Sequence, residues 1–409
     1  MNLRLSNRIV HRGTTIIEVL FAIGIVIFGI LGIASILPLA ARNAMQANEA
    51  SEGQAYALHY YSDFMIRGLN QASRWRWFND QNAPGSRYVA FLNSVAVPSG
   101  TSVGTTRTED RYAICIDPGF YADPSTLEAL PSSVFGASQP YRPGLFPYYQ
   151  DNFDPSSNPW SGANPSFFSG AVASDLPRLL RVTLADTSKT PPRLLTGKAI
   201  QQLFSSGDDI SVTIDEKDKT IPPFRLFENG TARGLSNMQY SWLATLCPRE
   251  PLRGELQTGA EAKYTLSIVV LHRRERTLFA PTGDGKNEIP QGERVVTVVP
   301  PSDSYAFVGG SGGRIALTAN LGFDDNLRTG DWLMLAKHLS PSLPRATVCR
   351  WYRIIGIDQD SVITGDLPSG TWTRNVILEG PDWNFGGSPT QATIVSNVVT
   401  VLERVVDIQ

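Results

Sequence analysis

The sequence predicts an α+β protein with a long N-terminal membrane-spanning helix, an antiparallel β-sheet head and a small added all-β module. An uncharged apolar run from Val19 to Ala41 predicts the helix. Two strand patterns, Met238 to Leu246 and Ala262 to His272, predict an antiparallel pair because only a polar loop separates them. After Gly292, short strand patterns recur about every ten residues, which is the spacing of a small β-barrel or sandwich.

The apolar run is long enough to cross a membrane. As a helix, residues 19–41 would extend about 34 Å, more than the hydrocarbon core of a bilayer. The helix is expected to continue to about Phe78, with a kink at Pro38 because proline removes a backbone donor. Beyond the membrane it becomes amphipathic, since apolar residues recur at steps of three or four: Leu58, Tyr61, Met65, Leu69 and Ala72.

The charges around the apolar run predict its orientation. Arg4, Arg8, His11 and Arg12 precede it, so the positive-inside rule places the N-terminus in the cytoplasm and the rest of the chain outside.

Glu18 stands at the head of this segment, where an acid costs about 1 to 3 kcal/mol and needs a positive partner. If the chain were cut after Gly13, the new α-amine of Thr14 would lie one helical turn from Glu18. In a packed array, the amine of one subunit could equally pair with Glu18 of the next.

The short basic leader, Gly13, Glu18 five residues later and the unbroken apolar helix resemble the N-terminus of type IV prepilins and type II secretion pseudopilins, over roughly residues 1–75. The resemblance implies a single-pass protein of the bacterial inner membrane with a periplasmic body. It implies that a prepilin peptidase cuts between Gly13 and Thr14 and that Glu18 guides docking to other pilin or pseudopilin subunits. Thr14 stands where the family usually has phenylalanine, which leaves its N-methylation open. The resemblance also implies that the amphipathic half of the helix packs on the sheet head.

Three other kinds of N-terminal segment fit these residues less well. A cleaved signal peptide would have a shorter apolar core and a small-x-small site, of which Leu37 to Ala41 is a weak version. A plain membrane anchor accounts for the length of the run but not for the spacing of Gly13 and Glu18. A buried core helix would be shorter and would lack the charged flanks.

The predicted domains are a leader (1–13), the long helix (14–79, transmembrane part 18–41), a globular head (80–290) and the β module (291–409). Within the head, residues 118–177 are rich in Pro, Gly, Ser and aromatics and predict a long irregular excursion. The other elements expected in the head are strands at Arg87–Val97, Arg111–Asp117, Arg178–Ala185 and Asp209–Asp215 and a helix at Thr196–Phe204.

Composition argues against several functions. The chain has 409 residues, a net charge of -2 and 18% charged residues, so nothing in its charge favours nucleic acid. The run Arg74 to Phe78 is interpreted as a helix end at which the aromatic side chains pack and the arginine side chains extend over them to solvent. Cys115, Cys247 and Cys349 match no metal spacing and are interpreted as buried small hydrophobes, with one disulfide and one thiol as the alternative. No metal or other cofactor is expected.

Catalytic motifs are weak. Gly309 to Gly313 matches G-x-S-x-G, and Asp331 and His338 follow Ser311 in the order of a hydrolase triad. A strand pattern follows at Arg314 where a nucleophile elbow needs a helix, so a glycine hairpin loop is the better interpretation. Residues 283–288 lack the end ligands of a calcium loop and predict a turn. The charged run His272 to Arg276 is interpreted as a solvated strand end, and no enzyme activity is expected.

The sequence therefore predicts a structural, minor pilin-like subunit of a type IV pilus, because a bulky head is hard to repeat along a tight array. A type II secretion pseudopilin is the nearest alternative. A membrane-anchored adhesin or carbohydrate-binding protein would use the aromatic loops, such as Pro140 to Tyr149, and a membrane-tethered hydrolase would use Ser311.

Overall fold

The computed structural model describes residues 15–78, 87–90, 113–117, 144–148, 177–188, 190, 192–195, 210–212, 234–236, 240–248, 263–274, 292–300, 306–321, 326–340, 343–358, 360–365, 370–386 and 389–408. They form two compact units, Met1–Glu52 and Gly53–Gln409. The predicted helix at Thr196–Phe204, the turn at 283–288 and most of the excursion at 118–177 lie outside the described residues.

The predicted α+β class is wrong, because the body is mostly β and contains a closed barrel. The described residues hold one α-helix, α1 (Ile16–Ile66), one short 3-10 helix, η1 (Ala72–Arg74), and twenty strands. The large sheet is also mixed rather than antiparallel, since β3 (Ile114–Ile116) pairs in parallel with β5 (Leu179–Asp186). Several strands lie where the sequence predicts them, and of the two alternatives predicted for the β module, barrel or sandwich, the barrel is the one formed.

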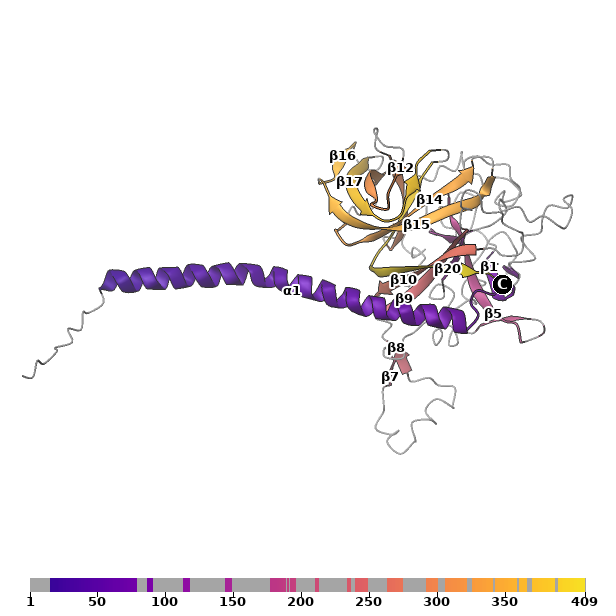
Figure 1. The fold of residues 1–409 in the computed structure, drawn as a ribbon, viewed down its shortest axis with the longest axis horizontal. Helices are drawn as coiled ribbons and strands as arrows, with labels where there is room; N and C mark the ends of the chain where they lie inside the picture. Colours follow the sequence, from indigo (N-terminus) through magenta and orange to yellow (C-terminus); the bar gives the residue numbers. More distant parts are fainter. Residues whose placement is uncertain are drawn as a thin grey trace, which may run out of the picture. The chain divides into compact units, whose positions relative to one another are not determined.

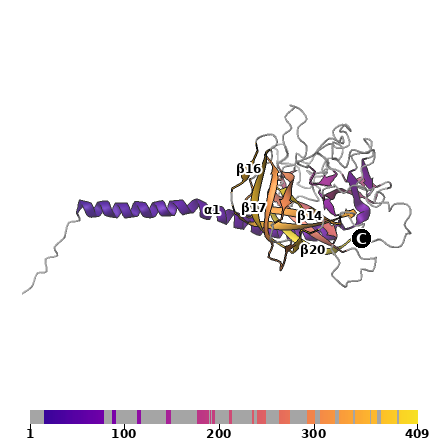
Figure 2. The same ribbon diagram turned by 90° about the horizontal axis from the view of Figure 1, so that it is seen from above.

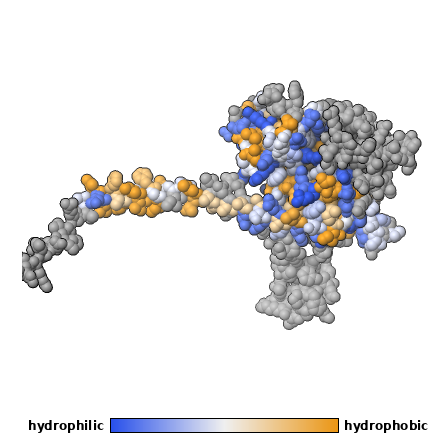
Figure 3. Space-filling view, viewed as in Figure 1, coloured by the Kyte–Doolittle hydropathy of each residue, from blue (hydrophilic) through white to orange (hydrophobic). Residues whose placement is uncertain are grey.

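The first unit contains most of α1, which continues through Pro38 as one helix. Its side chains are almost all exposed from Thr15 to Pro38. Figure 3 shows apolar residues covering this part of α1 on the face drawn.

In the second unit, α1 ends at Ile66, twelve residues before the predicted end at Phe78. Gly68 has a left-handed backbone (φ 61°), its N–H donates to the carbonyl of Met65 (3.1 Å), and the N–H of Leu69 donates to the carbonyl of Phe64 (3.0 Å). These two bonds form a Schellman motif, which stops a helix at a glycine. The chain then passes through η1 and enters β1 (Trp75–Phe78), so most of the predicted helix end from Arg74 to Phe78 is a largely buried strand.

The large sheet has nine strands in the order β2-β1-β5-β3-β9-β10-β20, with β4 and β6 attached to β5. The predicted antiparallel pair is confirmed as β9 and β10, in which Ile268 lies opposite Ala244. The remaining bounds are β2 (Tyr88–Ala90), β4 (Leu145–Phe146), β6 (Arg193–Leu194), β9 (Tyr240–Pro248), β10 (Lys263–His272) and β20 (Val398–Asp407). A separate pair joins β7 (Ile210–Val212) and β8 (Gly234–Ser236).

This sheet is buried on both faces, as strand β9 shows. Trp242, Ala244 and Leu246 lie in one apolar cluster together with Tyr60 and Phe64 from the end of α1. The alternate residues Leu243 and Cys247 lie in a second cluster on the other face, with residues of the barrel. Because successive side chains of a strand point to opposite faces, the sheet separates the last turns of α1 from the barrel.

The barrel is a ring of six strands that closes where β13 pairs with β17. In ring order its strands are β13 (Gly313–Asn320), β11 (Glu293–Val299), β19 (Gln391–Val395), β14 (Trp332–Ser340), β15 (Leu343–Ile357) and β17 (Thr371–Glu379). β16 (Val362–Thr364) pairs with β17, and the two lie side by side in both views (Figures 1 and 2). The short pair β12 (Ala306–Phe307) and β18 (Trp383–Asn384) adds aromatic side chains to the barrel core.

The last strand leaves the barrel. Asn397, which has a left-handed backbone (φ 63°), separates β19 from β20. β20 pairs with β10 along almost its whole length, so the C-terminus belongs to the nine-stranded sheet rather than to the barrel. The chain thus crosses from sheet to barrel at Glu293 and back after Val395.

Candidate functional site

The first candidate site is the start of α1. Gly13 and Thr14 lie outside the described residues. Glu18 is described: it is exposed and lies in the first helical turn. Its N–H lies 3.4 Å from Oγ1 of Thr15, and the carbonyl of Thr15 accepts from the N–H groups of Glu18 (3.0 Å) and Val19 (3.2 Å). Thr15 is therefore the N-cap, and Glu18 stands three residues later, where an acid also favours the helix dipole.

The segment that follows can span a membrane. Ile16–Pro38 has a mean hydropathy of 2.8 and none of it is buried inside the protein, and it is the one such helix among the described residues. Glu18 is its single charged residue. Large apolar side chains such as Phe21 (73% exposed) and Phe28 (77% exposed) are open on its surface. Exposed apolar area of this extent is stable in lipid or against other helices, as expected of a single-pass membrane protein.

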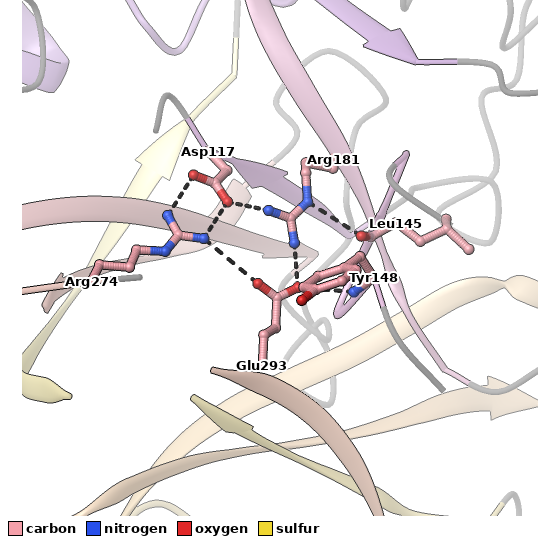
Figure 4. Close-up of polar contacts among 6 residues, drawn as sticks. All are labelled: Asp117, Leu145, Tyr148, Arg181, Arg274 and Glu293. Atoms are coloured by element: carbon pink, nitrogen blue, oxygen red, sulfur yellow. Dashed lines mark hydrogen bonds and ion pairs between the residues drawn. The ribbon is translucent and has the colours of Figure 1, made fainter. Parts of the chain in front are cut away.

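The second candidate is a buried ionic cluster that the sequence did not reveal, formed by Asp117, Arg181, Arg274 and Glu293 (Figure 4). Three members come from the nine-stranded sheet: Asp117 follows β3, Arg181 lies within β5, and Arg274 follows β10. Glu293 is the first residue of β11 and brings the barrel to the cluster. We call these four residues the sheet–barrel joint.

The joint is closely bonded. Arg181 lies between the carboxylates of Asp117 and Glu293 and donates through its two terminal nitrogens to one oxygen of each. Arg274 donates to both oxygens of Asp117 (2.6 Å each) and lies 3.6 Å from the second oxygen of Glu293. Backbone groups complete it: Nε of Arg181 donates to the carbonyl of Leu145 (3.2 Å), and the N–H of Tyr148 donates to Glu293 (2.9 Å).

The members of the joint are almost completely removed from solvent. The side chains of Arg181 and Asp117 are fully buried, that of Glu293 is 2% exposed and that of Arg274 is 12% exposed. Burial alone would lower the pKa of Arg181, but the adjacent carboxylates of Glu293 and Asp117 outweigh it and raise that pKa. Two positive and two negative charges sum to zero, so the joint needs no further ion. The joint is therefore suited to hold the sheet against the barrel rather than to bind a ligand.

A disulfide reinforces the same interface. Cys247 of β9 is bonded to Cys349 of β15, with 5.9 Å between their Cα atoms, and Cys115 is a free buried thiol. The interpretation of three unbonded cysteines is therefore wrong, and the alternative of one disulfide and one thiol is confirmed. Beside it, Nε1 of Trp351 on the barrel donates to Oγ1 of Thr245 on the sheet (2.9 Å).

Other residues with catalytic potential in the sequence are not brought together as sites. β13 begins two residues after Ser311, where a nucleophile elbow needs a helix, so no strand–turn–helix elbow forms there. Asp331 precedes β14, whereas His338 lies far along that strand, about 23 Å away at the rise of a strand. Nδ1 of His338 instead contacts Oγ1 of Thr347 (3.3 Å).

Two charged runs differ from their interpretation. Arg274 belongs to the run interpreted as a solvated strand end, and it is in fact part of the joint. In the run from Arg74 to Phe78, the predicted helix is wrong but the predicted packing of the aromatic residues is right: Trp75 and Trp77 are buried in the sheet core. A signal for the joint is present in the sequence, because Arg181 interrupts an apolar strand and a charge in that position needs partners.

No cluster of His, Cys, Asp or Glu in the described residues could hold a metal ion. Comparisons with protein-family models, with curated proteins and with solved structures found no match to this chain.

Proposed function

We propose that this chain is a type IV pilin-like structural subunit, made as a membrane-anchored precursor, cut after Gly13 and assembled through its N-terminal helix. The observation that carries the proposal is the start of α1. An exposed, membrane-length apolar helix begins three residues after Gly13, and it carries its single charge at Glu18.

Glu18 supplies the recognition step. The proposed cut creates the α-amine of Thr14 close to the exposed carboxylate of Glu18, within one subunit or between two. When apolar helices associate away from water, an unpaired carboxylate among them is costly, so pairing with an amine selects one register of docking.

The proposed topology has the N-terminus in the cytoplasm and the body in the periplasm. The basic residues before α1 support this orientation. The disulfide Cys247–Cys349 supports it independently, because disulfides persist in oxidising compartments such as the periplasm.

A binding role for exposed aromatic rings has less support. In the described part of the body, every Trp and Tyr side chain is buried or half-buried, which leaves no open aromatic platform of the kind that binds sugar rings.

The experiment is substitution of Glu18 in cells that contain the prepilin peptidase and the partner subunits. We expect Glu18→Ala to be cut and to fold normally but to be absent from sheared filaments or from the assembled pseudopilus fraction. Glu49→Ala is the matched control, because it removes another acid of α1 outside the apolar segment. Normal incorporation of Glu18→Ala would remove the docking role.

A further inference from the structure

The three cysteines lie in one buried cluster between sheet and barrel, although they are far apart in sequence. Cys115 (0% exposed), Cys247 (1%) and Cys349 (3%) all belong to the same apolar cluster. The free thiol is therefore enclosed next to a disulfide. A fold with a single disulfide does not require a third cysteine in that place.

The register of the sheet puts Cys115 next to Cys247. Cys115 of β3 lies opposite Thr245 of β9, and Cys247 is two residues farther along β9 on the same face. Such diagonal neighbours have Cα atoms about 7 to 8 Å apart. A disulfide spans Cα distances up to about 7 Å, so this pair is bridged only while β3 and β9 can still shift slightly. Cys349, at 5.9 Å from Cys247, is the better partner in the finished fold.

The two pairings differ in what must already be folded. Cys115 and Cys247 lie in adjacent strands of one sheet, so their contact needs that sheet alone. Cys349 lies on the barrel strand β15 and reaches Cys247 only when the barrel has formed and docked. A sheet that forms first would thus present Cys115 to Cys247 before Cys349 arrives.

We infer that Cys115 is the transient disulfide partner of Cys247 during oxidative folding and that Cys349 displaces it when the barrel docks on the sheet. In the first step a small or protein disulfide oxidant takes two electrons and two protons from Cys115 and Cys247 and is itself reduced to two thiols. In the second step the thiolate of Cys349 attacks Sγ of Cys247. The Cys115–Cys247 bond breaks, the Cys247–Cys349 bond forms, and the released Cys115 thiolate takes up a proton. The exchange is redox-neutral.

Burial then makes the exchange irreversible in practice. The nucleophile in thiol–disulfide exchange is the thiolate, and burial raises the pKa of the Cys115 thiol well above its usual value. The released thiol therefore stays protonated beside the disulfide and does not attack it.

The test is a refolding time course of the full-length chain in detergent. The reduced, unfolded protein is diluted into glutathione disulfide, samples are quenched with acid and alkylated, and disulfide-linked peptides are quantified by mass spectrometry. We expect Cys115–Cys247 to form early and to decline as Cys247–Cys349 grows. In Cys349→Ser, we expect Cys115–Cys247 to accumulate as the main product.

Oxidation in denaturant is the control for chance pairing. There, Cys115 and Cys247 are 132 residues apart in sequence and Cys247 and Cys349 are 102 apart, so the first loop closes about 1.5-fold less readily. If Cys115–Cys247 is more abundant under folding conditions than in denaturant, the excess shows that the sheet has brought these two cysteines together.

Two results would overturn the inference. One is a wild-type time course in which Cys247–Cys349 is present from the first sample and Cys115 is alkylated throughout. The other is an early population dominated by Cys115–Cys349. Because the wild-type chain alone decides this, a folding defect in Cys349→Ser does not affect the outcome.

Discussion

Replacing Arg181 by methionine should strongly destabilise the body. Methionine keeps much of the volume but removes the guanidinium that lies between Asp117 and Glu293 and that also donates to the carbonyl of Leu145. Two buried carboxylates would then share Arg274, which already gives both of its terminal nitrogens to Asp117.

The expected cost follows from leaving a buried charge without its partner. Glu293 would keep the N–H of Tyr148 at 2.9 Å and a distant contact of 3.6 Å with Arg274. Breaking a fully buried ion pair from one side costs about 3 to 5 kcal/mol. At about 2 °C per kcal/mol for a large domain, the melting temperature should fall by about 6 to 10 °C.

The assay is thermal unfolding of the full-length chain in detergent, followed by tryptophan fluorescence, because Trp75 and Trp242 are buried in the sheet core. Arg314→Met is the matched control: Arg314 pairs with Asp358 at 2.8 Å but is 55% exposed. An exposed pair contributes less than about 1 kcal/mol, so this control should shift the melting temperature by no more than about 2 °C.

A double variant separates charge from packing. Arg181→Met together with Glu293→Met leaves the neutral pair of Asp117 and Arg274, so it should cost less than the sum of the two single changes. If Arg181→Met melts within error of Arg314→Met, or if the double variant is strictly additive, the joint does not fasten the barrel to the sheet.

Three further predictions concern the core and the cysteines. Phe64→Ala, at the end of α1, should lower the free energy of unfolding by about 3 to 5 kcal/mol, because Phe64 is buried in the sheet core. Leu58 is 52% exposed on the same helix, so Leu58→Ala should change it by less than about 0.5 kcal/mol. Equal effects of the two changes in a urea titration would contradict the packing of this helix end. Reducing Cys247–Cys349 should cost about 2 to 5 kcal/mol in the same titration, and an unchanged midpoint would argue against the disulfide. Burial raises the pKa of the Cys115 thiol in the folded state, so its contribution to stability is fully present below about pH 8.5, the pKa of an unfolded cysteine. Above that pH, the free energy of unfolding should fall by up to about 1.4 kcal/mol per pH unit more steeply than in Cys115→Ala. Parallel pH profiles of the two proteins would contradict this.

Long, regular patterns were predictable from the sequence. β9 and β10 are runs of nine and ten residues rich in apolar side chains, and only one polar loop separates them in the sequence, so local rules find them. The helix end was missed because Gly68 stands in an otherwise helical pattern, and its role as a stop depends on its left-handed backbone, which composition alone does not reveal.

Features that depend on contacts distant in sequence were not predictable. The barrel closes through β13 and β17, which are about 55 residues apart, and short strand patterns alone fit a sandwich equally well. The joint brings Asp117 to Arg274 across 157 residues, and in the sequence each of these two residues looks like an ordinary charged strand end. The isolated Arg181 in an apolar strand was the one local sign that a partner must exist.

At the N-terminus, the sequence motif goes further than the structure. Gly13 and Thr14 define the proposed cut by spacing alone, while the structure contributes the exposed helix and the N-cap at Thr15. The helix-capping role and the docking role of Glu18 are compatible, since a carboxylate that favours the start of a helix can still pair with an amine. Gly13→Leu should block processing, and a shortened product from that variant would count against the motif.

The most direct measurement is the N-terminal mass of the protein recovered from cells with an active prepilin peptidase. The proposed function predicts a chain that begins at Thr14, with or without one added methyl group. A chain that still begins at Met1 or Asn2 would contradict it, and the protein would then be a membrane-anchored body whose Gly13 and Glu18 share their spacing with prepilins by coincidence.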